Sequence, residues 1–303
     1  MDIHNRGARP LATILGGVLA LTAAFGTVAR ADQSTPITAP PVIIVRAPSG
    51  NVTIVRGDDS TVSVQGNPAA GLTEVPIQTD AQGRIALPSA PGMPSRRIMI
   101  PGIEAGSSAI RIDDPGGDVS VVVPQHVAAI LVKADGGSVS MSDTRGPYVI
   151  LAPNGSVTLF RVAGFGNVRT TAGSVNMTQV GGFVHVETAM GTVTGTEMYS
   201  QRAEINTQGG DIQWNFARVG DGPYRFTSSA GDVHVGLDER SVASIDAQSN
   251  QGSVVNRFGP RFAMVRYQSL HATSLNLGGG GPQITAMSQS GKVDIGPRLR
   301  PRP

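Results

Sequence analysis

The sequence contains no cysteine among its 303 residues. No disulfide can brace the fold, no thiol can act as a nucleophile or metal ligand, and no lipobox can carry an acyl anchor. Aromatic residues make up only 4% of the chain and charged residues only 15%. A compact core built on large rings is therefore not expected, whereas the Val, Ile, Ala and Leu content suits many short strands.

The first 31 residues have the three parts of a secretory signal peptide. Arg6 and Arg9 form a positive n-region, the apolar segment 11–28 follows, and Ala29-Arg30-Ala31 is a small-x-small cleavage site. Cleavage near Ala31 predicts an exported protein, periplasmic or secreted to the cell surface, with no transmembrane segment in the mature chain. The alternative, an uncleaved membrane anchor, is disfavoured by the glycines at 16, 17 and 26 and by the cleavage site.

The leader also accounts for the net charge of the chain. Its three arginines and one aspartate give +2, which equals the net charge of the whole sequence, so the mature chain is formally neutral. A neutral chain with only two lysines gives nucleic acid little electrostatic reason to bind, and no nucleic acid partner is expected.

Glycine is abundant, with 39 residues, and nine of the glycines head a repeat. The pattern Gly-x-[Val/Ile]-x-apolar begins at Gly117 and returns at steps of 18 to 21 residues, with a last step of 39 that is close to two periods. The first apolar positions form one column: Val119, Val139, Val157, Val175, Val193, Ile212, Val233, Val254 and Val293. A second column follows half a coil later: Ile130, Ile150, Val168, Val186, Ile205, Phe226, Ile245 and Val265. Small side chains two positions further on indicate an inward corner: Ala152, Thr170, Thr188, Thr207, Ser228 and Ala247.

These columns predict an all-β, single-stack β-solenoid that resembles a parallel β-helix, with coils of about 18–21 residues. Each coil holds two short strands of alternating burial, and glycine supplies a positive φ or a close approach at the corner. A single coil cannot bury its apolar face, but stacked coils form continuous apolar ladders. We expect the coils to stack in chain order, with 274–281 filling the missing coil.

The same pattern divides the chain. Residues 1–31 are the signal peptide and 32–41 a linker. Residues 42–116 form an N-terminal cap with irregular first coils, in which 88–94 is a loop and 97–100 a strand. Residues 117–296 form the regular solenoid, and 297–303 a disordered tail rich in Pro and Arg.

The segment Val42-Ile-Ile-Val-Arg-Ala-Pro-Ser-Gly-Asn-Val-Thr-Ile54 resembles the opening of the "putative adhesin" domains of bacterial exported proteins. The Gly-[Ser/Asp]-Val series and the ending Gly291-Lys-Val-Asp-Ile295 are similar to that family as well. The resemblance covers roughly 42–295 and implies a β-solenoid of mostly unassigned, adhesin-like function. It implies no catalytic residues.

Candidates for chemistry are few. The mature chain has four histidines, which lie far apart in sequence: His126, His185, His234 and His271. No metal-ligand spacing occurs, and the Asp residues after glycine are too irregular for a calcium-binding β-roll. The densest acidic group, Asp113, Asp114 and Asp118, surrounds Pro115-Gly116-Gly117 and indicates a turn. We therefore expect no metal, no cofactor and no enzymatic activity.

A recurring polar position remains. The outward residue after each first apolar position gives a strip of hydroxyl and amide groups: Ser120, Ser140, Thr158, Asn176, Thr194, Gln213 and His234. The strip is either the ordinary polar outer face of a sheet or a ligand ladder for a glycan or another repetitive surface. The sequence thus favours an exported, non-catalytic, adhesin-like binding module that acts as a monomer on a glycan or an envelope or surface protein. The alternatives are a self-assembling structural protein of the envelope and a carbohydrate-active enzyme.

Overall fold

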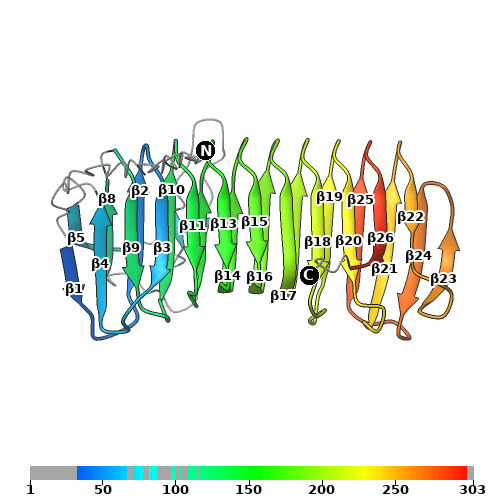
Figure 1. The fold of residues 1–303 in the computed structure, drawn as a ribbon, viewed down its shortest axis with the longest axis horizontal. Helices are drawn as coiled ribbons and strands as arrows, with labels where there is room; N and C mark the ends of the chain where they lie inside the picture. The colour runs from blue at the N-terminus through cyan, green and yellow to red at the C-terminus, as the bar shows by residue number, and fades with distance from the viewer. Residues whose placement is uncertain are drawn as a thin grey trace, which may run out of the picture.

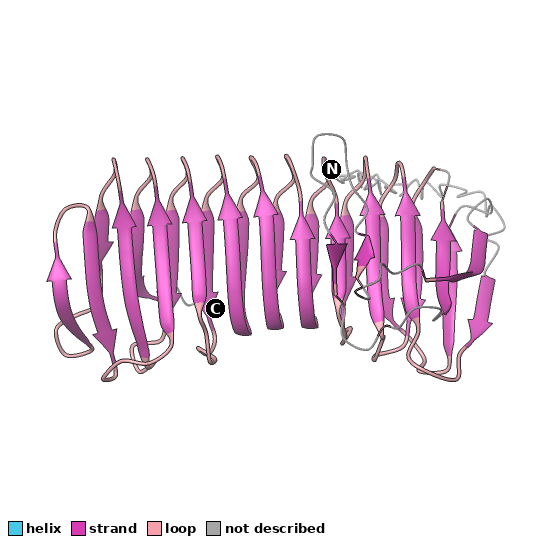
Figure 2. Cartoon of the chain, turned by 180° about the vertical axis from the view of Figure 1, so that it is seen from behind, coloured by secondary structure: helices cyan, strands magenta, loops and turns pink. Residues whose placement is uncertain are grey.

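The computed structural model describes residues 33–66, 71–77, 82, 84–86, 97–99, 103, 108–114 and 116–298. The expected signal peptide, the loop at 88–94 and the tail from 299 lie outside this part of the chain. Its described elements are strands, joined by turns and loops (Figure 2). No helix in the described ranges is long and apolar enough to cross a membrane. Two long sheets, A and B, face each other along an elongated stack of coils (Figure 1).

Along the stack, the strands of each sheet follow a spatial order that differs from their order in the chain. Sheet A consists of β1 (Gln33–Pro36), β4 (Thr61–Gly66), β9 (Val119–Val123), β3 (Val52–Arg56), β11 (Val139–Ser142), β13 (Val157–Phe160), β15 (Val175–Thr178), the first part of β17 (Val193–Thr207), β18 (Ile212–Phe216), β20 (Val233–Leu237), β26 (Val293–Pro297) and β22 (Val254–Asn256). Sheet B consists of β5 (Gly71–Pro76), β8 (Ser108–Asp113), β2 (Val42–Ala47), β10 (Ala129–Ala134), β12 (Tyr148–Leu151), β14 (Ala163–Arg169), β16 (Gly181–Thr188), the last part of β17, β19 (Tyr224–Ser228), β25 (Gln283–Ser288), β21 (Ala243–Ser249), β24 (Ala272–Leu277) and β23 (Ala263–Gln268). A separate small sheet pairs β6 (Ile85–Ala86) with β7 (Arg97–Ile98).

A regular coil runs along sheet B, turns at a glycine corner, runs along sheet A and turns again. Parallel pairing places the predicted first apolar column in register, with Val157 beside Val139 and Val175. Every member of that column is at most 6% exposed. The β-solenoid predicted from the sequence is therefore confirmed, because period-2 alternation buries one face of every strand between the two sheets.

The glycine corner is required by close approach rather than by backbone conformation. A Cβ added at Gly137, Gly155, Gly173 or Gly191 would lie 1.6 to 2.0 Å from the carbonyl oxygen of the glycine one coil away. Of the stacked corner glycines, only Gly50 and Gly117 have positive φ, at 85° and 131°. Any side chain at this corner would therefore push the coils apart.

The predicted small residues lie at the start of the glycine corner and are buried, and those with hydroxyl groups bond the backbone of the glycine turn. Thr170 Oγ1 donates to the Gly173 carbonyl at 2.8 Å and contacts Thr188 Oγ1 at 2.8 Å. Ser228 accepts from Gly231 N at 2.8 Å. At the C-terminal end the equivalent position is Ser249, not the predicted Ala247, since Ser249 accepts from Gly252 N at 2.9 Å.

The second apolar column is correct only in its centre. Ile150, Val168, Val186, Ile205 and Phe226 are in register. Ile130 and Ile245 were each placed two residues too early in this column. The residue in register with Ile150 is Val132, and the residue that continues the column beyond Phe226 and Ala286 is Ala247. Val265 lies on the antiparallel edge strand β23 and is 42% exposed. Corners of unequal length shift the register by two residues without changing which face is buried.

The coils do not stack in chain order, and this expectation was wrong at both ends. The coil β2–β3 lies between β8–β9 and β10–β11. The coil β25–β26 lies between β19–β20 and β21–β22, and Figure 1 shows these red strands among yellow ones. Residues 274–281 do not fill a missing coil, because β24 runs antiparallel to β21. A regular β2–β3 coil thus lies inside the stack rather than in the N-terminal cap.

The stack finishes in antiparallel strands at its N-terminal end and, in sheet B, at its C-terminal end, whereas the last strand of sheet A, β22, pairs parallel with β26. At the N-terminal end β4 pairs antiparallel with β9 and β5 with β8, and at the C-terminal end β24 and β23 continue sheet B. Ile77 and Ile103 also pack with Leu131 and Val149 on the outer face of sheet B, where alternation alone predicts polar residues. An antiparallel end strand does not present the parallel template that another coil would extend.

Candidate functional site

The predicted polar strip is a single row on the outer face of sheet A. Strand register brings its seven residues together in order: Ser120, Ser140, Thr158, Asn176, Thr194, Gln213 and His234. The inserted coils add two members that sequence spacing missed, namely Thr53 between Ser120 and Ser140, and Asp294 after His234. Asp294 follows Val293 of the first column, so the repeat pattern itself points to it, whereas the place of Thr53 depends on the stacking order because its neighbours are distant in sequence.

The row is the centre of a wider surface over four coils. The residues directly after the corner glycines form the first row, and the predicted strip is the middle row. The third row lies two residues after the middle row on each strand. Ten of the twelve positions carry a hydroxyl group and none carries a charge: Ser138, Ser140, Ser142, Ser156, Thr158, Phe160, Ser174, Asn176, Thr178, Thr192, Thr194 and Thr196. We call this surface the hydroxyl grid. Strand geometry spaces it at about 4.8 Å between coils and about 7 Å between rows.

The first row also has a structural role. Asp118 Oδ1 accepts from Asn51 N at 2.8 Å, Asn51 Oδ1 accepts from Ser138 N at 3.0 Å, and Ser138 Oγ accepts from Ser156 N at 3.3 Å. Farther along, Asp211 Oδ1 accepts from Asp232 N at 2.8 Å. At these positions the Ser, Asn or Asp after the glycine therefore caps a backbone N–H of the next coil, which explains the residue choice without a calcium ion.

Phe160 is the exception within the hydroxyl grid, and sequence reasoning missed it. Its ring is 39% exposed between Ser142 and Thr178. The Arg161 guanidinium lies 4.5 Å from the ring centroid, and Arg161 Nε contacts Asp143 Oδ1 at 2.7 Å. Asp143 and Arg161 both have positive φ, at 57° and 53°. The Arg161 guanidinium thus packs over the Phe160 ring at the edge of the grid.

A charged cluster ends the middle row. Arg257 Nε and Lys292 Nζ contact the Asp294 carboxylate at 2.7 and 3.3 Å. Burial alone would raise the pKa of Asp294, but the hydrogen bonds from Arg257 and Lys292 outweigh burial and lower it below its ordinary value. Burial lowers the pKa of neighbouring His234, although Asp294 opposes that shift. This cluster separates the uncharged surface from the C-terminal coils.

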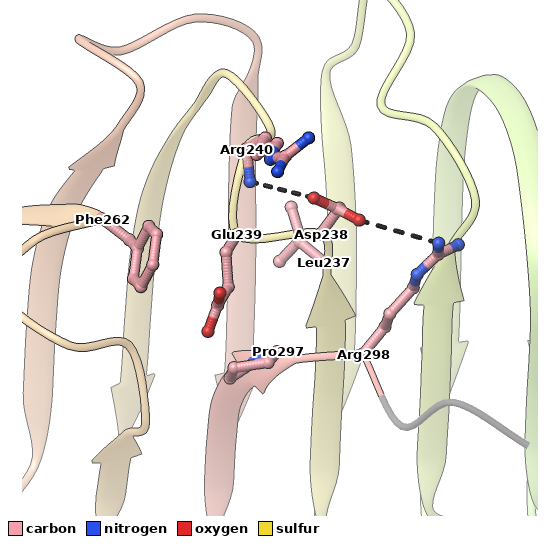
Figure 3. A pocket seen from close by; sticks show the side chains of 7 residues that line it. All are labelled: Leu237, Asp238, Glu239, Arg240, Phe262, Pro297 and Arg298. Atoms are coloured by element: carbon pink, nitrogen blue, oxygen red, sulfur yellow. Dashed lines mark hydrogen bonds and ion pairs between the residues drawn. The ribbon is translucent and has the colours of Figure 1, made fainter. Parts of the chain in front are cut away.

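A notch of about 490 Å³ lies where β20 and β26 end (Figure 3). Its lining residues come from the turn after β20, the end of β26 and the loop before β23: Leu237, Asp238, Glu239, Arg240, Phe262, Pro297 and Arg298. Asp238 holds the turn, because its carboxylate contacts Arg298 Nη2 at 3.6 Å and accepts from Arg240 N at 3.0 Å. A smaller notch of about 260 Å³ lies near the other end, beside His126.

The remaining candidates do not converge. His185 lies on sheet B between Glu187 and Glu204, at 3.0 and 3.5 Å, whereas His234 is on sheet A. His271 contacts the Gly252 carbonyl at 2.7 Å. In the described ranges, no three His, Cys, Asp or Glu residues are placed to hold a metal ion.

The densest acidic group is occupied by structural contacts. Asp113 contacts Arg111 Nε at 2.6 Å, Asp114 Oδ1 accepts from Gly116 N at 3.1 Å, and Asp118 binds Asn51. These bonds are those of turns and coil corners, as the turn interpretation of the sequence expects.

The profile of a family described as Toastrack DUF4097 matches residues 42–296, which is nearly the whole solenoid. The chain belongs to the Toastrack family. The Toastrack match spans the segment whose sequence resembles adhesin-like domains and confirms that resemblance.

Other comparisons with this Toastrack chain are distant. A solved structure described as a "putative cell adhesion protein" from Clostridium sporogenes aligns with 89% of this chain and 100% of its own, at 8% identity and a TM-score of 0.27. No curated protein matches this Toastrack chain in sequence.

Proposed function

We propose that this Toastrack protein is an exported, non-catalytic binding module of the cell envelope or surface, and that its hydroxyl grid contacts a polysaccharide. The observation that carries the proposal is the grid itself: a flat, uncharged surface of regularly spaced hydroxyl groups on four successive coils. Such a surface offers many weak, repeated hydrogen bonds, which suits a polymer with repeated hydroxyl groups. The leader at 1–31 supports export.

Two features favour this function over the alternatives. The antiparallel strands that end both sheets at the N-terminal end, and sheet B at the C-terminal end, disfavour growth into filaments, which supports a discrete monomer. The densest acidic group of the sequence, Asp113, Asp114 and Asp118, is engaged in structural bonds, which disfavours it as the acid–base group of a carbohydrate-active enzyme. The oligomeric state is tested by light scattering after size-exclusion chromatography, and we expect the mass of a monomer. A dimer would indicate an interface at the edge strand β23, where Met264 and Tyr267 are 64% and 57% exposed.

Binding is tested with a glycan array and with pull-down on peptidoglycan, chitin and cellulose. We expect the mature protein to bind at least one polysaccharide without releasing soluble sugar. Thr194→Arg, within the hydroxyl grid, should weaken binding by about tenfold or more, since it places a charge on the contact surface. Thr227→Arg, on sheet B, is the matched control and should bind normally. Equal binding by the two variants would exclude the grid as the contact surface, and release of sugar would indicate an enzyme.

A further inference from the structure

The larger notch is a direct consequence of the inserted C-terminal coil. In a regular coil, a short link leads from sheet A to the next strand of sheet B, as residues 161–162 do between β13 and β14. The link 238–242 instead joins β20 to β21 although β25 and β26 lie between them. Among the described residues none leads from β26 back into sheet B. The link 238–242 therefore spans the corner of this coil, and its residues 238–240 line the notch.

The walls of the notch combine apolar and charged groups. Phe262, 40% exposed, and Pro297 face the space from different elements, and the Glu239 side chain lies between them (Figure 3). Arg298 is paired with Asp238. Within the described part of the chain, the Glu239 carboxylate and the Arg240 guanidinium have no hydrogen-bond or ion-pair partner, so both are available to a ligand.

We propose that the notch binds a neutral saccharide unit, with Phe262 as the stacking surface and Glu239 as the hydrogen-bond acceptor for sugar hydroxyls. This site rests on the proposed function, because it supplies the polysaccharide with a place for one of its sugar rings. A pyranose has an apolar C–H face that packs on an aromatic ring, and vicinal hydroxyls that donate to a carboxylate. Two acids and two arginines balance the lining charge, so a charged ligand would be attracted by one group and repelled by another.

The position and size of the notch agree with this ligand. Its volume of about 490 Å³ lies within the range of small-molecule pockets. It opens at the ends of β20 and β26, the strands that carry His234 and Asp294 of the middle row. A glycan lying on sheet A can therefore reach the notch with one end.

The test uses the mature protein and four monosaccharides: glucose, galactose, mannose and N-acetylglucosamine. Binding is measured by saturation-transfer NMR and titration. We expect at least one sugar to bind, Phe262→Ala to lower its affinity by about tenfold, and Glu239→Gln to lower it by about tenfold. Phe262→Tyr should retain binding, which separates loss of the ring from loss of folding. Tyr267→Ala removes another exposed aromatic outside the notch and should have no effect.

Three outcomes would overturn the inference. If no monosaccharide binds while the polysaccharide still does, the notch is not a sugar site but the proposed function stands. If arginine methyl ester binds in place of the sugars and Glu239→Gln abolishes that binding, the notch is a site for a cation. If sugars bind equally to all variants, they bind elsewhere. Conversely, sugar binding that depends on Phe262 in a protein that fails to bind any polysaccharide supports the notch and contradicts the hydroxyl grid.

Discussion

Individual residues in this protein are constrained mainly by the distance between coils. Corner glycines and Tyr148 show this most clearly, because the closest contacts of each lie one coil away rather than in its own strand. In such a repeat protein, a larger side chain therefore clashes with the neighbouring coil, and a smaller one leaves a cavity between the two coils.

Gly173→Ala should destabilise the protein by about 3 kcal/mol or more, beyond ordinary overpacking. The added Cβ would lie 1.8 Å from the Gly155 carbonyl oxygen, and a backbone atom cannot move aside by rotating. Gly209→Ala is the matched control, because its Cβ would have no neighbour closer than 3.7 Å. Urea denaturation should show a large loss for the first variant only, and similar stability of the two would contradict the close-approach explanation.

Tyr148→Phe should be neutral or stabilise the protein by about 1 kcal/mol. The Tyr148 hydroxyl is buried and has no hydrogen-bond partner among the described residues, and burial raises the pKa of this group above its ordinary value. Tyr224 provides the contrast, since its hydroxyl donates to Ser200 O at 2.8 Å and accepts from Gly220 N at 2.6 Å. Tyr224→Phe should therefore destabilise the protein by about 1–2 kcal/mol in the same denaturation experiment. The opposite ranking of the two variants would disprove the assignment.

His234 should make the protein less stable in mild acid. Burial lowers its pKa in the folded state, so the unfolded chain binds the proton more readily once the pH falls below about 6.5. Stability contributed by the neutral imidazole is present above that pH and is lost as the pH falls towards the folded-state pKa. Melting temperature measured between pH 7 and 5 should fall less steeply in His234→Gln. Asp294, whose pKa is also lowered, acts only at lower pH, near the ordinary range of a carboxyl group.

At the scale of elements, each coil contacts only the coils on either side. Strands β13, β15 and β17 pair successively in sheet A, as do β14, β16 and β17 in sheet B. Adjacent coils are therefore close to interchangeable as packing partners, provided that the period-2 alternation is retained.

Deletion of the coil from Gly173 to Met190 should leave a folded protein of lower stability. After the deletion Val157 can pack on Val193 and Val168 on Ile205, because these residues occupy the same columns as the removed Val175 and Val186. Far-ultraviolet circular dichroism and a single cooperative urea transition provide the measurement. An unfolded product, with point substitutions on either side tolerated, would contradict coil-by-coil packing.

At the scale of the whole molecule, the C-terminal coil acts as a connector. β25 joins β19 to β21, and β26 joins β20 to β22, so the last two strands of the chain hold separate parts of the stack together. The N-terminal coil β2–β3 occupies the equivalent position between β8–β9 and β10–β11. Both coils depend on segments distant in sequence, unlike the regular coils between them.

Removal of residues 282–298 should loosen the C-terminal part selectively. Amide hydrogen exchange should become faster in β21 and β22, which lose their pairing with β25 and β26, and in β24 and β23, which are attached to the stack through β21. Strands β11 to β16 should remain protected. The Gly173–Met190 deletion is the comparison, because it removes a coil without separating two parts of the stack. Unchanged exchange in β21 to β24 would show that the connector is dispensable.

The sequence by itself determined the repeat, the two-sheet coil, the buried first column and the single polar row that includes Thr158 and Asn176. These follow from local rules, since alternation decides which side chains face inward and glycine spacing decides where the chain turns. Tertiary structure alone decided the stacking order, the third row with Phe160, and the notch beneath the 238–242 link. The reason is that parallel pairing through the backbone is nearly independent of side chains, so a coil can insert between any two others that share its register. The periodicity of the sequence therefore predicts the structure of one coil, whereas the packing of the whole stack determines which coils lie next to each other.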